Sequence, residues 1–333
     1  MPARSHFVLL AALLASLGFS LLSSHLDPYY LDICINVGIN IILAVSLNLI
    51  NGFTGQFSLG HAGFMAVGAY TAASITMTLG PRWFGGPSPW LFLPALLSGG
   101  LMAALAGLLV GVPSLRLKGD YLAIVTLGFG EIIRVIFRNM ESVGGSLGLQ
   151  GIPDYTTPFW TFGFAALTLY VVSNLVNSTY GRGFIAVHDD EVAAAAMGIN
   201  PTKFKIVAFV VGAFFAGVAG GIYGHFKLSI DPKGFDFIKS IEIVVMVILG
   251  GMGNNVGVVL AAIVLTLLPE FLRTMAGWNL PNPFGSGQLS LRWIADTRMI
   301  IYSLLIVILM LVRPQGLVPE SMVKSKGKGG ISN

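Results

Sequence analysis

The sequence predicts an all-α protein, a polytopic integral membrane helical bundle of about ten spans with two regions broken by glycine and asparagine. Of its 333 residues, 55% are hydrophobic and 10% are charged, whereas a soluble domain carries about 25% charged residues. The mean hydropathy is +0.81. Too few polar side chains are available to cover a globule of this size, so most of the surface must contact lipid.

Apolar runs of roughly the length that crosses a bilayer recur along the chain. The uniform runs cover residues 7–22, 30–50, 90–112, 159–176, 204–223 and 299–312. A further run at 60–79 is rich in Gly, Ala and Thr, which suits a helix packed against other helices. The run at 121–136 contains Glu131 and Arg134 on one helical face, and we interpret them as a snorkelling ion pair near a helix end.

The stretch 238–272 is too long for one ordinary span, since about 35 helical residues would reach roughly 50 Å. It is interrupted between Gly250 and Gly257 by glycines and asparagines, whose backbone groups lipid cannot satisfy. We therefore expect two helices joined by a hairpin. This gives ten spans in all and places both termini on one side of the membrane.

The chain divides into a transmembrane domain at residues 1–318 and a basic tail at 319–333. We expect the tail to be disordered, because glycines among lysines have nothing to bury. The tail and a long interior loop at 180–203 favour cytoplasmic termini. The first apolar run lacks a small-x-small cleavage site, which favours a retained helix over a cleaved signal peptide.

No constellation of residues predicts catalysis on this chain. The sequence lacks a Gly-x-x-x-x-Gly-Lys-Ser/Thr phosphate loop, and the glycines at 251–257 have neither the spacing nor the strand context of a dinucleotide site. The single cysteine, Cys34, excludes an intramolecular disulfide, and five scattered histidines do not indicate a metal site. Lys and Arg are dispersed, so nothing indicates nucleic-acid binding.

Polar side chains gather in the first interrupted region, 48–63, and in the helix before it. Irregular polar backbone at membrane depth is tolerated only beside water or protein, so these side chains are candidates to line a translocation path. A turn with close helix packing, in which asparagines bond neighbouring helices, explains the pattern equally well. The candidate path residues are Asn36, Asn40, Asn48, Asn51, Gln56, Ser58 and His61.

The interior loop at 180–203 contains a second candidate site. Asp189, Asp190 and Glu191 stand at the predicted start of a short helix, where the helix dipole favours anions. An alanine run follows, and Gly198 ends the helix. This helix has no membrane to enter and little core to bury, so it is suited to dock on a partner. An ordinary amphipathic connector is the alternative.

Motifs spread over nearly the whole chain resemble one family, the permease subunits of ABC importers for branched-chain amino acids, the LivM type. Besides the loop at 180–203, they are GQFSLGHAGF at 55–64, LRLKGDYLAI at 115–124, GLQGIP at 148–153, LGGMG at 249–253 and RPQGL at 313–317. The resemblance implies a non-catalytic subunit of a bacterial cytoplasmic (inner) membrane transporter.

The partners that the resemblance implies are a second related permease, two cytoplasmic ATPases that bind ATP and Mg, and an extracytoplasmic solute-binding protein. Contacts with membrane lipid are expected and contacts with nucleic acid are not. In the family, a coupling helix in the loop after the sixth span docks on the ATPase. Its positions here are Asp189, Asp190, Glu191, Ala193, Ala194, Ala195, Gly198 and Asn200.

The resemblance also implies an ATP-driven import of branched-chain or other hydrophobic amino acids. Urea or short amides are the alternative within the same class. A stand-alone channel or secondary transporter is the alternative from another class, but such a protein typically uses buried ionisable groups to couple ions.

Overall fold

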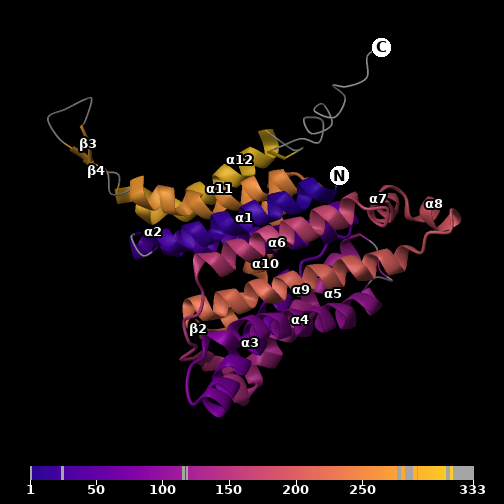
Figure 1. Ribbon diagram of the computed structural model, residues 1–333. Coiled ribbons are helices and arrows are strands. Elements are labelled where there is room, and N and C mark those ends of the chain that lie inside the picture. The colour runs from indigo at the N-terminus through magenta and orange to yellow at the C-terminus, as the bar shows by residue number, and fades with distance from the viewer. Residues whose placement is uncertain are drawn as a thin grey trace.

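The computed structural model describes residues 2–23, 26–114, 117, 119–275, 279–281, 288–290, 292–312 and 316–317 (Figure 1). The long helices are α1 (Pro2–Leu22), α2 (Pro28–Asn48), α3 (His61–Phe84), α4 (Phe92–Ser114), α5 (Asp120–Asn139), α6 (Pro158–Asn177), α9 (Pro201–Lys227), α10 (Phe237–Gly250), α11 (Asn255–Met275) and α12 (Arg292–Val312). The short elements are the π-helix η2 (Leu49–Phe53), the 3-10 turns η3 (Pro89–Leu91), η4 (Glu141–Val143), η5 (Gly145–Leu147) and η6 (Pro232–Phe235), the helices α7 (Gly181–Asp189) and α8 (Glu191–Ala196), and the strands β1 (Leu149–Gln150), β2 (Ser229–Ile230), β3 (Asn279–Pro281) and β4 (Gln288–Ser290).

Every predicted apolar run lies in a helix, which confirms the all-α class. Among the described residues, six helical segments are long and apolar enough to cross a membrane, and the predicted count of ten spans is not confirmed. The six are Pro28–Phe53, His61–Arg82, Pro89–Ser114, Pro158–Asn177, Pro201–Lys227 and Asn255–Met275.

Helices α3, α4 and α9 pack backbone against backbone through small residues. A Cβ atom at Gly220 would collide with the carbonyl oxygen of Met65, and one at Gly68 would collide with the backbone of Gly217. Close approach of this kind needs glycine on at least one helix and is a usual way for helices to associate in lipid. This close packing is the physical reason why the run at 60–79 is rich in Gly and Ala.

Both predicted interruptions are present. Helix α2 passes into η2, the backbone from 54 to 60 is irregular, and α3 begins at His61. Helix α10 ends at Gly250 and α11 begins at Asn255, so the stretch 238–272 forms two helices. Helix α10 has 14 residues and a length of about 21 Å, which is short for a complete crossing.

Helices α7 and α8 project from one end of the bundle (Figure 1). Both ends of the described chain lie toward this end: His6 contacts Tyr170 in the half of α6 that leads to α7, and the Leu317 N–H donates to the Leu249 carbonyl near the end of α10. Strand β1 pairs antiparallel with β2, and β3 with β4. The predicted tail 319–333 and the charged positions Arg116 and Lys118 lie outside the described residues.

Candidate functional site

The irregular segment between η2 and α3 is held by specific hydrogen bonds. The Gln56 N–H donates to the Ile50 carbonyl at 3.1 Å, and the Ser58 N–H donates to the Asn51 Oδ1 at 3.2 Å. The Leu59 N–H donates to the hydroxyl of Thr126 in α5 at 3.0 Å. Protein groups therefore satisfy these backbone donors, as the membrane interior requires.

Four candidate path residues of this segment form what we call the polar core: Asn51, Gln56, Ser58 and His61. All four are buried. The Nε2 of His61 lies 2.9 Å from the Ser46 hydroxyl. Among the described residues, however, no partner is found for the Asn51 and Gln56 amide nitrogens, the Gln56 amide oxygen, the Ser58 hydroxyl or the His61 Nδ1. Buried polar atoms without partners are costly, so the polar core is chemically equipped to bind water or a polar solute.

Asn48 joins the two interruptions. Its side-chain Nδ2 donates to the Oδ1 of Asn255 at 3.0 Å, and its Oδ1 accepts from the Gly253 N–H at 3.0 Å. Asn255 in turn donates to the hydroxyl of Ser173 in α6 at 3.2 Å. The two glycine- and asparagine-rich regions, about 200 residues apart in sequence, thus contact each other.

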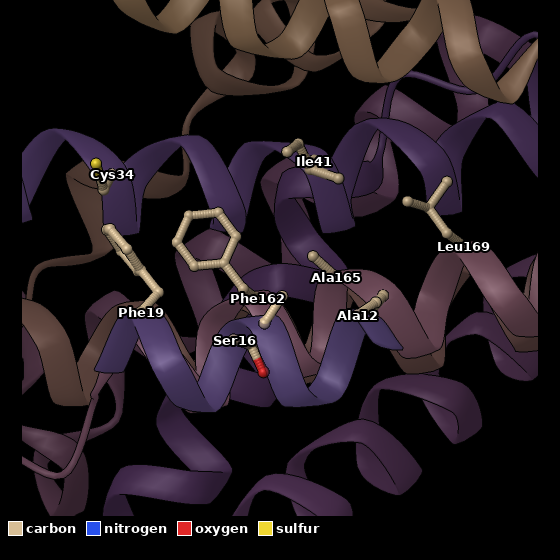
Figure 2. Close-up of a pocket in the computed structure, with 10 residues that line it drawn as sticks. Ala12, Ser16, Phe19, Cys34, Ile41, Phe162, Ala165 and Leu169 are labelled. Atoms are coloured by element: carbon tan, nitrogen blue, oxygen red, sulfur yellow. The ribbon is translucent and has the colours of Figure 1, made fainter. Parts of the chain in front are cut away.

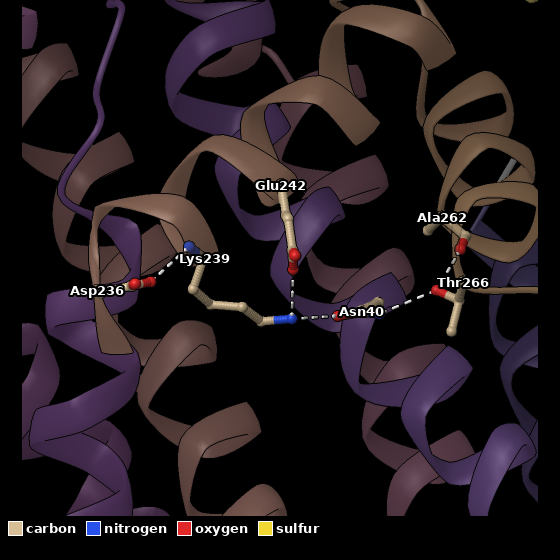
Figure 3. Close-up of polar contacts among 6 residues, drawn as sticks. All are labelled: Asn40, Asp236, Lys239, Glu242, Ala262 and Thr266. Atoms are coloured by element: carbon tan, nitrogen blue, oxygen red, sulfur yellow. Dashed lines mark hydrogen bonds and ion pairs between the residues drawn. The ribbon is translucent and has the colours of Figure 1, made fainter. Parts of the chain in front are cut away.

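Asn40 belongs to a second polar network (Figure 3). Its Nδ2 donates to the Thr266 hydroxyl at 2.9 Å, and its Oδ1 accepts from Lys239 at 3.5 Å. Lys239 also pairs with Glu242 at 3.2 Å. The hydropathy pattern does not single out this pair of charges. The signal that finds it is the spacing of Lys239 and Glu242, three residues apart at the start of an apolar run.

Asn36 lies apart from the other candidates. It donates to the backbone carbonyl of Asp32 at 2.8 Å and to the Asp32 carboxylate at 3.1 Å, within its own helix. Asp32 also pairs with Lys227 of α9 at 3.2 Å. Asn51, Gln56, Ser58 and His61 therefore all lie buried between η2 and the start of α3, while Asn36 and Asn40 bond elsewhere.

The interior loop contains two helices where a single short one is predicted. The Asp190 carboxylate accepts from the backbone N–H groups of Val192 and Ala193 and so caps α8. Asp189 is the last residue of α7, so its predicted place at the start of the short helix is wrong. The extended backbone of Asp190 separates the two helices.

The end of α8 agrees with its sequence signals. Gly198 has a φ of 87°, in the left-handed region that glycine adopts readily. The Ile199 N–H donates to the Ala194 carbonyl at 3.0 Å, which closes the last turn. Asn200 then caps α9 by accepting from the Lys203 N–H at 3.2 Å.

One face of α8 rests on the protein and the other faces outward. Ala194 is buried, and Glu191 pairs with the nearly buried Lys205 of α9 at 2.9 Å. Ala193 and Ala195 are exposed, and Met197 is 83% exposed. Exposed apolar side chains beside a short capped helix form a surface that suits a protein partner.

Helix α7 connects α8 to the irregular segment. Its Phe184 packs edge-on against Phe204 of α9, with ring centroids 5.6 Å apart. Near the end of α7 that adjoins α8, the Cδ2 of His188 would lie 2.9 Å from a Cβ atom at Gly55. A displacement of α7 would therefore move His188 against the backbone at Gly55, which leads to the polar core.

Two other features do not join this site. Glu131 and Arg134 form the predicted ion pair at 2.6 Å, with both side chains partly exposed. A cavity of about 550 Å³ between α1, α2 and α6 is lined by apolar side chains such as Phe19, Ile41 and Phe162 (Figure 2). Its lining offers a polar solute almost no hydrogen-bonding group.

Metal ligation finds no support in the part of the chain that the structure describes, where no three His, Cys, Asp or Glu side chains are grouped to hold an ion. The polar core consists of amide, hydroxyl and imidazole groups. It can exchange hydrogen bonds with a neutral or zwitterionic solute.

Known proteins resemble this chain along most of its length. The family model described as branched-chain amino acid transport system / permease component matches residues 29–311. The chain is 34% identical to the high-affinity branched-chain amino acid transport system permease protein LivM of Escherichia coli, over 90% of this chain and 72% of LivM. No solved structure matches it.

More distant relatives include another branched-chain amino acid permease and a nucleoside permease. LivH of Salmonella typhimurium, also a high-affinity branched-chain amino acid transport system permease protein, is 22% identical over 67% of this chain and 78% of LivH. The nucleoside ABC transporter permease protein NupC of Lactococcus lactis is 24% identical over 68% of this chain and 76% of NupC.

Proposed function

Because the chain belongs to the family of branched-chain amino acid transport system permease components, we propose that it is the transmembrane subunit of an ATP-driven importer of branched-chain or other hydrophobic amino acids. Its membership of the family confirms the resemblance that the motifs indicate. The observation that carries the mechanism is the direct contact between α7 and the segment leading to the polar core, through His188 and Gly55.

In this proposal, α8 docks on a cytoplasmic ATPase. Met197, Ala193 and Ala195 supply the exposed contact surface. Ala194 and Glu191 hold α8 against α9, while Asp190, Gly198 and Asn200 define the ends of the helices. Closure of two ATPases around ATP and Mg would shift α8, and α7 would transmit the shift. Such a shift changes access only if the ATPases bind the two states with different affinity.

The polar core is the proposed path for the solute. Amide and hydroxyl groups bind a zwitterion weakly enough for release. Several of these buried polar atoms have no partner among the described residues, so binding of water or solute would stabilise them. A second homologous permease would complete the path, as the existence of both LivM and LivH suggests. An extracytoplasmic binding protein would deliver the amino acid.

We place the chain in the bacterial inner membrane with both termini in the cytoplasm. The support is that the first and last described parts of the chain lie toward the end that carries α7 and α8, which is the end proposed to meet the ATPases. ATP and Mg would bind to the ATPases, and this chain would hold no cofactor of its own.

The test is reconstitution of the chain with the permease, ATPase and binding protein encoded beside its gene. ATP-dependent uptake of labelled leucine into liposomes is expected, with valine and isoleucine as competitors. Uptake driven by an ion gradient without ATP would reject the class of transporter. Uptake of urea, acetamide or a nucleoside in place of leucine would reject the proposed substrate and keep the class.

A matched pair of variants tests the docking surface. Met197→Glu is expected to reduce recovery of the ATPase with this chain by about tenfold, since burying a charge without a partner costs at least about 1.4 kcal/mol. Leu147→Glu changes a residue that is equally exposed, 84% against 83%, but lies in η5 between α5 and α6. The Leu147→Glu variant should recover the ATPase fully, and equal recovery from both variants would refute docking at α8.

A further inference from the structure

A cavity of about 360 Å³ lies where α4 and α6 begin. Its lining includes Trp90, Phe92, Asp154, Tyr155 and Trp160. Helix α6 has 20 residues and leads at its other end toward α7. The cavity is therefore about 30 Å from α7, at the opposite end of the bundle.

Aromatic rings form a fixed wall of this cavity. The Phe92 ring centroid lies 5.4 Å from that of Trp160 and 5.9 Å from that of Tyr155. Both Phe92 and Tyr155 pack against the ring of His225. Trp90 stands at the mouth and is 85% exposed. The faces of such rings attract cations through their quadrupoles.

The His225 ring offers this cavity no free nitrogen. Its Nδ1 lies 2.7 Å from the Gly221 carbonyl oxygen, and its Nε2 lies 2.9 Å from the Thr76 hydroxyl. The ring therefore supports the aromatic wall without presenting a donor to a ligand.

Asp154 supplies a negative charge without a cationic partner. No Lys, Arg or His among the described residues lies within ion-pair distance of its carboxylate. Partial burial raises the pKa of Asp154, while a hydrogen bond with the Thr156 backbone opposes that change. Asp154 as a whole residue remains exposed, and a carboxylate without a counter-ion beside aromatic ring faces attracts a cation.

We propose that this cavity binds an ammonium group, held between the Asp154 carboxylate and the faces of Trp90 and the neighbouring rings. The described lining offers no cation that could receive the α-carboxylate of an amino acid. The cavity also lies at the starts of the membrane segments Pro89–Ser114 and Pro158–Asn177, where lipid headgroups are found. The ethanolamine headgroup of a phospholipid, whose phosphate lies farther from its nitrogen, is therefore the favoured source. This inference does not depend on which solute is transported.

Native mass spectrometry of the intact transporter, extracted from membranes, tests the proposal. Phosphatidylethanolamine is expected to remain bound to the wild type in preference to phosphatidylglycerol. Trp90→Ala should weaken its retention about two- to fivefold, the effect of one cation–ring contact at an exposed site. Asp154→Asn should weaken it at least as much, with no change for phosphatidylglycerol.

Controls separate this site from general lipid contact. Glu141→Gln removes an exposed carboxylate that follows α5, and Tyr121→Ala removes an exposed ring at the start of α5. Both should leave phosphatidylethanolamine retention unchanged. Leucine and ethylamine are added as competitors: displacement by ethylamine alone supports a headgroup source, and displacement by leucine assigns the ammonium site to the amino acid. Equal retention of the two lipids with no displacement, or equal losses in controls and test variants, would overturn the proposal.

Discussion

The contact between α8 and α9 depends on an ion pair whose two members differ in burial. The Lys205 Nζ lies 2.9 Å from the Glu191 carboxylate, and the side chains are 8% and 30% exposed. Glu191→Gln would leave the lysine charge nearly buried without an anion. Loss of one partner costs about 3–5 kcal/mol when both are buried, and an exposed pair contributes about 0–1 kcal/mol. Because this pair is buried on the lysine side only, we expect Glu191→Gln to lower the local stability of α8 on α9 by about 2 kcal/mol.

Hydrogen–deuterium exchange of the peptide that covers α8 measures this loss locally. A loss of about 2 kcal/mol corresponds to roughly 30-fold faster exchange of the α8 amides, since each 1.4 kcal/mol is a factor of ten. Amides of α3 and α4 should exchange at the wild-type rate, because α8 packs against α7 and α9. Local release of α8 would thereby be distinguished from global unfolding.

Substitution of the other member of the ion pair is the matched control. Lys205→Met removes the buried charge, fills its volume with an apolar chain and leaves Glu191 in contact with water, so exchange should change little. The double variant Glu191→Gln with Lys205→Met should also resemble the wild type. If Lys205→Met loosens α8 as much as Glu191→Gln does, an uncompensated buried charge is not the cause.

Three further substitutions test other contacts. Gly55→Ala, at a φ of 66°, should lower the free energy of unfolding by about 1–2 kcal/mol through backbone strain, and by a further amount because the new Cβ atom meets His188. Adding His188→Ala should restore only the loss caused by the contact with His188, as measured by thermal unfolding. Asn48→Ala removes two hydrogen bonds between the interruptions, and we expect a loss of about 1–3 kcal/mol and slower leucine uptake; an unchanged uptake rate would contradict a role in the path. Gly220→Ala places a Cβ against a backbone carbonyl of α3 and should abolish monodisperse protein in size-exclusion chromatography, whereas Gly128→Ala, with open space around it, should not.

The interruptions were predictable from sequence because their cause is local. The glycines and asparagine at 251–254 cannot continue a helix in lipid without partners, and α10 ends at Gly250 while α11 begins at Asn255. The caps of α8 are equally local, since Asp190 and Gly198 act within a few residues of their own positions. Local rules of backbone geometry suffice for features of this kind.

The partners of the asparagines were not predictable in this way. Asn40 bonds Thr266 and Asn48 bonds Asn255, each more than 200 residues away, so the choice depends on how α2 packs against α11. The position of Lys239 was not predictable from hydropathy, because the apolar residues after it dominate the mean hydropathy of any window long enough to span a membrane. Periodicity identifies a polar stripe, but only tertiary packing decides which of its members meet.

The glycine contacts among α3, α4 and α9 restrict how the bundle can change shape. Where two backbones touch with no side chain between them, even a small sliding motion brings peptide groups into collision, so these three helices must travel as one rigid body. Helix α2 is joined to α11 by amide and hydroxyl bridges, which water can replace one at a time. A change between two shapes would therefore be concentrated where α2 meets α11, next to the irregular segment that follows α2 and η2.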